Sequence, residues 1–174
     1  MIENVNQILI SKMDSDGAFR GELSSSALAT ALTAFALFSV DFEKFSTQID
    51  KCLNWLKNNA NPDGGWGDSP LNHSNISSTL LCRASLSIVE NQTEYSKFIS
   101  NADAFILNEI KKKNCNNLAD AIRSIYGNDK TFSVPILAFC AFSNLNPDLK
   151  IDWKNVPALP FELSLLPRSF SRFL

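Results

Sequence analysis

Four aspartates in two short glycine-containing segments are the first residues of this sequence whose spacing suggests chemistry. Asp14 and Asp16 lie in the segment DSDG, and Asp63 and Asp68 flank GGWG within NPDGGWGDSP. Paired carboxylates can serve as general acid and base when their environments separate their pKa values. Aspartate before glycine is also the usual composition of a turn. We interpret Asp14 and Asp16 as turn acids, and the sequence predicts no catalytic residue.

The other side chains capable of nucleophilic, redox or metal chemistry are widely separated. His73 is the only histidine, and we expect it to be solvated in the polar loop PLNHSN. The cysteines show no CxxC spacing, and we interpret them as free thiols on apolar helix faces: Cys52, Cys82, Cys115 and Cys140. GGWG lacks the lysine and the preceding strand of a phosphate-binding loop. We therefore expect neither a metal site nor a bound cofactor.

The composition is that of an ordinary globular chain. Its 174 residues suit a single domain over residues 1–174, and 45% of them are hydrophobic. The net charge of −2 gives no basic footprint, which argues against nucleic acid as a partner. The N-terminus does not resemble a secretion signal, and the apolar run over residues 26–40 is short for a membrane span. We expect a cytoplasmic protein.

Apolar residues recur at three- and four-residue spacing along most of the chain, which is the period of an amphipathic helix. This spacing predicts helices over residues 5–12, 26–40, 42–59, 75–89, 98–110, 118–126 and 132–145, with another short helix after Pro160. The segment over residues 132–145 is apolar on nearly every side, so we expect it to be buried. No segment alternates with a period of two, and the predicted fold class is all-α.

Two of the turns between these helices share one pattern. Gly17-x-Phe19 and Gly64-x-Trp66 stand 47 residues apart (64 − 17), each after an aspartate and before a helix that starts with serines. A fixed turn signature at this period indicates a helical-hairpin repeat. A turn does not need a tryptophan, so we expect Trp66 to be buried between hairpins, where the indole N–H needs a partner.

The repeated turn resembles the QW repeat of triterpene cyclases, in which an aliphatic residue, a glutamine, a glycine and an aromatic residue recur. Met13 and Ala60 stand at the glutamine position here, so the resemblance does not extend to an amide stacked on the indole. In that family the aromatic residue ties together the hairpins of an α/α barrel. The resemblance therefore implies an α/α barrel (toroid) segment built of helical hairpins.

A second block is similar to the N-terminal half of squalene-hopene-type cyclases. It comprises YGNDKTFSVPILAFCAFSNL followed by WKNVPALPFELSLLP. In those enzymes an FxVPIL-like helix leads into a W-x-x-V-P-x-L-P-x-E segment and lends side chains to the substrate cavity. The resemblance makes Phe132 and Ile136 cavity candidates, with an ordinary core position as the alternative. We assign four other phenylalanines to core packing: Phe35, Phe38, Phe139 and Phe142.

The resemblance also frames what the chain can catalyse. A class II cyclase protonates an alkene with the middle aspartate of a DxDD motif and guides carbocations with aromatic faces. This sequence contains neither DxDD nor the magnesium-binding DDxxD motif. The resemblance implies the N-terminal part or a subunit of such a cyclase, inactive without an acid-bearing region. The alternative is a non-catalytic module that binds an apolar ligand, such as an isoprenoid, or a partner protein.

A barrel segment would leave apolar faces uncovered, and exposed apolar patches usually mark interfaces. We therefore expect a complementary chain or a second copy to bind through residues 132–145 and 160–174. In the latter segment leucines and phenylalanines lie beside Arg168 and Arg172, so a peripheral contact with a membrane is the alternative.

Overall fold

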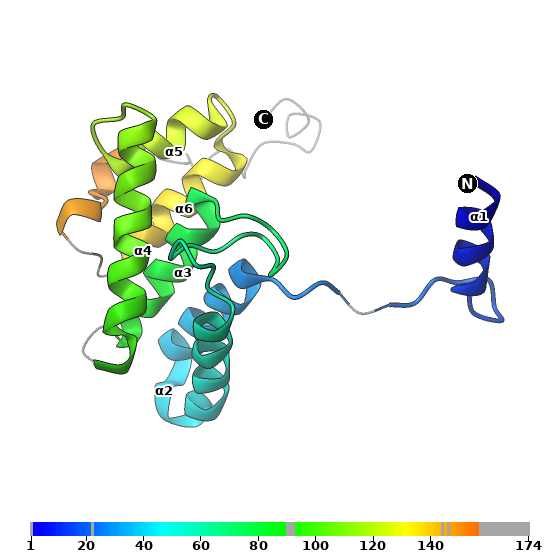
Figure 1. Cartoon of the computed structure of the whole chain (residues 1–174). Helices are drawn as coiled ribbons and strands as arrows, with labels where there is room; N and C mark the ends of the chain where they lie inside the picture. The colour runs from blue at the N-terminus through cyan, green and yellow to red at the C-terminus, as the bar shows by residue number, and fades with distance from the viewer. Residues whose placement is uncertain (1, 22, 90–92, 144, 146, 157–174) are drawn as a thin grey trace, which may run out of the picture.

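The chain forms helices and turns throughout its described part. The computed structural model describes residues 2–21, 23–89, 93–143, 145 and 147–156. The only β-type pairing among them is an isolated bridge between Met13 and Phe19. The helices, in order, are α1 (Ile2–Ser11), α2 (Ala27–Asn58), α3 (Ile76–Leu86), α4 (Thr93–Lys112), α5 (Leu118–Tyr126) and α6 (Lys130–Phe142), with 3-10 turns at Ser87–Val89, Pro147–Leu149 and Trp153–Asn155 (Figure 1). The predicted all-α class is confirmed.

Helix α2 consists of two helices that meet at Asp41. This residue has an extended backbone (φ −167°, ψ 99°), which interrupts the helical hydrogen bonds. Its carboxylate accepts a hydrogen bond from the backbone N–H of Lys44 at 3.0 Å, so Asp41 is the N-cap of the second half. Residues 27–40 and 42–58 run side by side in opposite directions (Figure 1). The break falls between the two helices predicted from the sequence.

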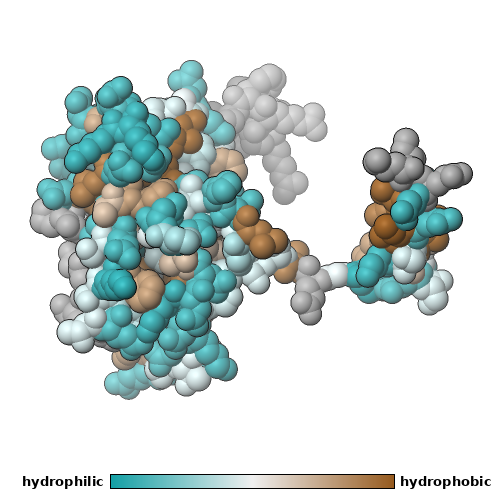
Figure 2. All heavy atoms as spheres, in the orientation of Figure 1, coloured by the Kyte–Doolittle hydropathy of each residue, from teal (hydrophilic) through white to brown (hydrophobic). Residues whose placement is uncertain are grey.

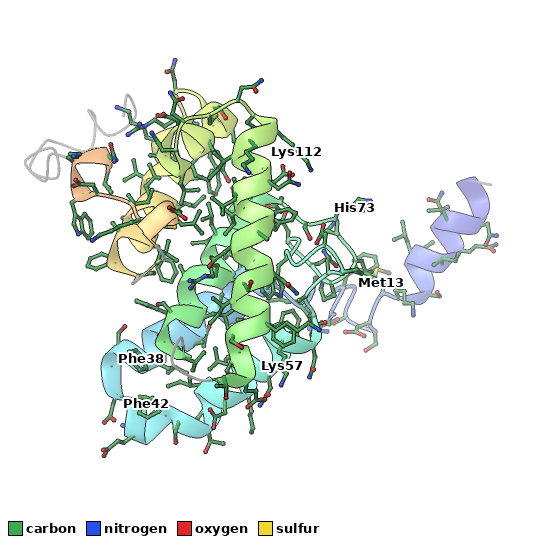
Figure 3. All side chains as sticks on the ribbon, turned by 60° about the vertical axis from the view of Figure 1, so that its left-hand side comes forward. Met13, Phe38, Phe42, Lys57, His73 and Lys112 are labelled. Carbon is green, nitrogen blue, oxygen red and sulfur yellow. The ribbon has the colours of Figure 1, made fainter. Side chains whose placement is uncertain are left out.

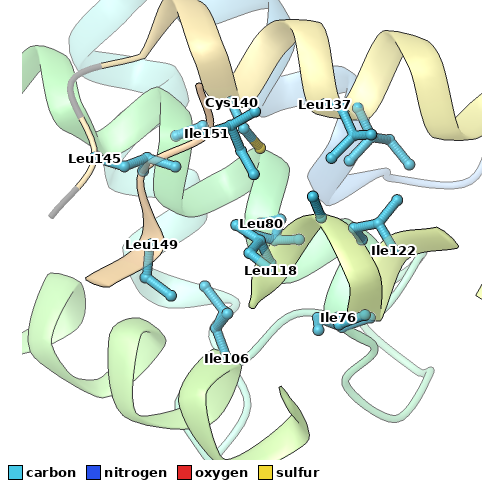
Figure 4. Packing of buried hydrophobic residues seen from close by; sticks show 14 of the residues in the cluster. Ile76, Leu80, Ile106, Leu118, Ile122, Leu137, Cys140, Leu145, Leu149 and Ile151 are labelled. Carbon is cyan, nitrogen blue, oxygen red and sulfur yellow. The ribbon is translucent and has the colours of Figure 1, made fainter. Parts of the chain in front are cut away.

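Helix α3 lies at the centre of the molecule, and every residue from Ile76 to Leu86 except Ser77 is buried. A helix surrounded on all sides has no polar face to expose, which explains its lack of a clear apolar stripe. Its side chains join two core clusters. One cluster includes α2, Trp66 and the start of α4, and the other includes the end of α4 with α5 and α6. Figure 4 shows Leu80 of α3 beside Leu118 of α5 in the second cluster.

A buried ion pair links α3 to α4. The Nε atom of Arg83 lies 2.6 Å from Oδ1 of Asp103, and the two side chains are 0% and 13% exposed. Burying two charges is costly unless they pair, so this contact fixes how the two helices face each other. The apolar pattern of α3 gave no indication that a charged residue would lie in the core.

Helix α6 differs from the helix expected over residues 132–145. It is buried on the side that faces α3 and α5, whereas Phe132 and Phe142 are exposed. The ring of Phe142 meets that of Trp153 edge-on, with centroids 4.7 Å apart. The expectation that this helix is buried all round is therefore wrong, because the described residues that pack against it leave Phe132 and Phe142 exposed. The short helix expected after Pro160 lies outside the described residues.

The other three phenylalanines assigned to the core differ in their surroundings. Phe38 is exposed beside Phe42 at the break in α2 (Figure 3), so its assignment to the core is wrong, as is that of Phe142. Among the described residues, no other helix covers the corner formed at Asp41. Phe35 and Phe139 are half-buried and meet edge-on, with centroids 4.8 Å apart.

Helix α1 and the turn after it lie apart from the other helices, joined to α2 by an extended segment (Figure 1). Apolar side chains gather on this separated segment (Figure 2) and are all exposed: Val5, Ile8, Leu9, Ile10, Met13 and Phe19. The helix expected over residues 5–12 is thus present, but its apolar face is uncovered in this structure. In the described part of the chain, no helix combines the length and apolar character needed to cross a bilayer.

Candidate functional site

The turn after α1 is closed by its own backbone and by an aspartate. The N–H of Gly17 donates to the carbonyl of Asp14 at 2.9 Å, and the N–H of Asp14 donates to the carbonyl of Ala18 at 2.8 Å. The carboxylate of Asp16 accepts a bond from the N–H of Ala18 at 3.2 Å. Gly17 has φ +82°, a conformation that residues with a side chain rarely adopt.

The turn after α2 repeats these bonds 47 residues later (61 − 14). The N–H of Gly64 donates to the carbonyl of Asn61, and the N–H of Asn61 donates to the carbonyl of Gly65, both at 2.9 Å. Asp63 accepts a bond from the N–H of Gly65 at 3.0 Å, and Gly64 has φ +86°. The two turns therefore share these three hydrogen bonds and a glycine at positive φ in equivalent positions.

The aromatic residues of the two turns have opposite surroundings. Trp66 is 1% exposed, its Nε1 donates to the carbonyl of Leu56 at 2.9 Å, and its backbone N–H donates to Oγ1 of Thr79 at 3.0 Å. Trp66 thus connects the end of α2, through its ring, with α3, through its backbone. Phe19 is 62% exposed, since none of the helices that the structure describes packs over the first turn. Its backbone pairs with that of Met13.

The two carboxylates of the first turn form ion pairs with one arginine side chain. The Nη1 atom of Arg20 lies 2.7 Å from Oδ2 of Asp14, and its Nη2 atom lies 2.6 Å from Oδ2 of Asp16. The guanidinium, together with the N–H of Ala18, lowers the pKa of Asp16 below its ordinary value. A carboxyl that is ionised at neutral pH has no proton to give to an alkene. The geometry supports a role for Asp14 and Asp16 in the turn.

The remaining candidate side chains do not converge. His73 lies in the loop between α2 and α3 (Figure 3), and the described residues contain no group of three or more His, Cys, Asp or Glu side chains that could hold a metal ion. The four cysteines are free thiols, as expected, but Cys115 lies in the loop between α4 and α5 and not on a helix face. Burial raises the pKa of the Cys82 and Cys140 thiols, so both remain protonated and unreactive.

An apolar pocket lies where α2, α3 and α6 meet. Its volume is about 400 Å³, at the lower end of the range for sites that bind small molecules. Both predicted cavity residues line it: Ile136 is buried in its wall, and Phe132 is exposed at its edge. Sequence reasoning did not identify the other described residues that line it: Leu28, Leu32, Asp68, Ser77, Ser78, Leu81, Pro135 and Phe139. The spacing of Leu28 and Leu32, one helical turn apart, was the sequence signal that could have indicated an apolar face here.

Each polar side chain that lines the pocket makes at least one hydrogen bond. Oδ1 of Asp68 accepts a bond from Oγ of Ser78 at 2.7 Å and another from Nδ2 of Asn75 at 2.9 Å. These bonds, the one from Ser78 first, lower the pKa of Asp68 below its ordinary value. The hydroxyl of Tyr126 donates to Oγ of Ser77 at 2.9 Å. The pocket therefore combines apolar walls with one ionised carboxylate, an arrangement suited to binding rather than to proton donation.

Comparison with known protein families gives a match that covers most of the chain. The family model of the squalene-hopene cyclase N-terminal domain matches residues 2–136, which is 135 of the 174 residues (136 − 2 + 1). The matched range includes both glycine turns and reaches Ile136 in the pocket wall. No curated protein and no solved structure matches the chain.

Proposed function

The chain belongs to the squalene-hopene cyclase N-terminal domain family, and from that membership we propose that it acts as the N-terminal part or a subunit of a class II terpene or triterpene cyclase. The family match, which covers both turns and the helices as far as α6, is the observation that carries this proposal. Domains of this family are α/α barrels, in keeping with the helical hairpin formed by the two halves of α2.

In the proposed reaction this chain supplies apolar surface and not the acid. The sequence has no DxDD motif, and the carboxylates nearest in pattern, Asp14 and Asp16, are paired with Arg20. The proton must then come from a region that carries DxDD. We propose that this region, on a complementary chain or in another part of the assembly, packs against the helices described here.

Two exposed apolar surfaces support such a contact. The first is the uncovered face of α1, and the second is the pair formed by Phe142 and Trp153. Apolar residues gathered in this way commonly mark interfaces between proteins. A second copy of the chain is the alternative occupant, and light scattering on the purified chain, alone and mixed with the acid-bearing region, distinguishes the two.

Incubation with squalene tests the proposed division of labour. The chain alone is expected to give no cyclic product by gas chromatography, and addition of a DxDD-bearing cyclase region is expected to give product. Replacing the middle aspartate of that motif with asparagine should abolish the product, whereas Asp16→Asn in this chain should not change it. Turnover by the chain alone, lost in Asp16→Asn, would refute the proposal.

The pocket of about 400 Å³ favours one second candidate, a non-catalytic module that binds an apolar ligand. The same assay separates the two. If the mixture with the acid-bearing region yields no cyclic product although the two proteins are folded and concentrated, whereas the chain alone binds squalene, the module is the better description.

A further inference from the structure

We propose that the pocket between α2, α3 and α6 binds an apolar chain that carries a cationic head, such as a protonated long-chain amine, with the head at Asp68. This inference goes beyond the proposed function, because it requires the pocket alone and holds whether or not the protein takes part in cyclisation. Three features of the pocket carry it: its walls, its charge and the state of its hydroxyl groups.

The walls suit a hydrocarbon chain. Leu28 and Leu32 of α2, Leu81 of α3 and Ile136 of α6 approach from three helices and present methyl groups to the same space. Burying a hydrocarbon against such walls is favourable in proportion to the area removed from water. The exposed edge of the pocket, at Phe132, leaves a way in for an extended molecule.

The charge of the pocket suits a cation. Of the described residues that line it, Asp68 alone is charged, and none is a lysine or arginine. Oδ1 of Asp68 accepts two hydrogen bonds, whereas Oδ2 receives none from the part of the chain that the structure describes. An ammonium group placed at Oδ2 would find an opposite charge and a free acceptor together.

The pocket is less suited to an anionic head. The proton of the Ser78 hydroxyl is already donated to Asp68, and the hydroxyl of Ser77, which accepts a bond from Tyr126, keeps its own proton but carries no positive charge. A carboxylate or phosphate head would therefore meet an ionised carboxylate without a cation to compensate it. A neutral alcohol could donate to Oδ2 but would lack the attraction between charges.

Isothermal titration calorimetry with three ligands of equal chain length tests this inference. Dodecylammonium, dodecanol and dodecanoate are titrated at neutral pH, below their aggregation concentrations. We expect dodecylammonium to bind about fivefold more tightly than dodecanol, because a partly exposed charge pair contributes a gain of about this size. Dodecanoate should bind most weakly. Asp68→Asn can retain the bonds to Ser78 and Asn75 and should reduce the binding of dodecylammonium to that of dodecanol.

Two controls locate the site. Asp50→Asn removes an equivalent charge from an exposed position on α2 outside the pocket, and it should leave all three affinities unchanged. Leu28→Gln in the pocket wall should weaken all three ligands, whereas Leu71→Gln, at an exposed loop position outside this pocket, should not. Equal affinities for the three ligands, or a preference for the amine that survives Asp68→Asn in a folded variant, would overturn the inference. Neither result depends on cyclase activity.

Discussion

Replacing the aromatic residue of each turn with alanine gives two substitutions at equivalent positions with very different expected costs. Trp66 is 1% exposed and donates its indole N–H to the carbonyl of Leu56. Removing a buried aromatic side chain costs about 3–5 kcal/mol, because both apolar burial and packing are lost. Phe19 is 62% exposed, so Phe19→Ala should change the free energy of unfolding by about 0.5 kcal/mol or less.

Urea unfolding followed by circular dichroism at the helical band measures both values. Trp66→Phe should fall between them, at about 1–2 kcal/mol, because the ring is largely preserved while the carbonyl of Leu56 loses the indole as a donor. Trp55 and Trp153 remain in every variant and give a fluorescence signal as a second probe.

Comparable costs for Trp66→Ala and Phe19→Ala would refute this reasoning. A loss below about 1 kcal/mol for Trp66→Ala would mean that the ring contributes little to joining α2 with α3. A loss of several kcal/mol for Phe19→Ala would mean that the first turn is packed against other parts of the protein in solution.

The other predictions rest on the same contrast between buried and open positions. Gly64→Ala should cost about 2–4 kcal/mol in urea unfolding, because its φ is +86° and a Cβ atom would lie 2.8 Å from the carbonyl oxygen of Asn101, whereas Gly17→Ala, with open space around it, should cost about 1–2 kcal/mol. Equal losses would show that the contact with Asn101 yields at no cost. Asp103→Ala should cost about 3 kcal/mol by leaving the buried Arg83 without this carboxylate, and Arg83→Met combined with Asp103→Leu should cost less than Asp103→Ala alone. A double variant less stable than Asp103→Ala would show that the ion pair contributes more than apolar packing at that site.

Local sequence patterns predicted the helices and the turns well because these depend on neighbouring residues. The boundary at Asp41 follows from an N-cap that a single side chain supplies. The matched turns follow from glycines at positive φ and from the aspartates beside them. Such features are encoded within a few residues, so one sequence is enough to find them.

Features that depend on which helices become neighbours were not predictable in the same way. The apolar composition of α6 could not show that Phe142 would be exposed while Leu137 would be buried. The pocket required α2 and α3 to meet α6, so only two of its residues were named, and those by resemblance. The burial of Arg83 depends on its partner, Asp103, which lies 20 residues away on another helix, so the sequence around Arg83 does not indicate it.

The length of the segment between the first turn and α2 limits the distance between α1 and the other helices. Six residues separate Phe19 from the N-cap Ser26 (26 − 19 − 1). Fully extended, they span about 20 Å at roughly 3.3–3.6 Å per residue. A protein bound to α1 is thereby kept near the start of α2. With so short a tether, the local concentration of the bound protein around the other helices lies in the millimolar range. Even a weak contact with α1 would hold a bound protein beside the pocket, since Leu28 of its wall follows Ser26 by two residues.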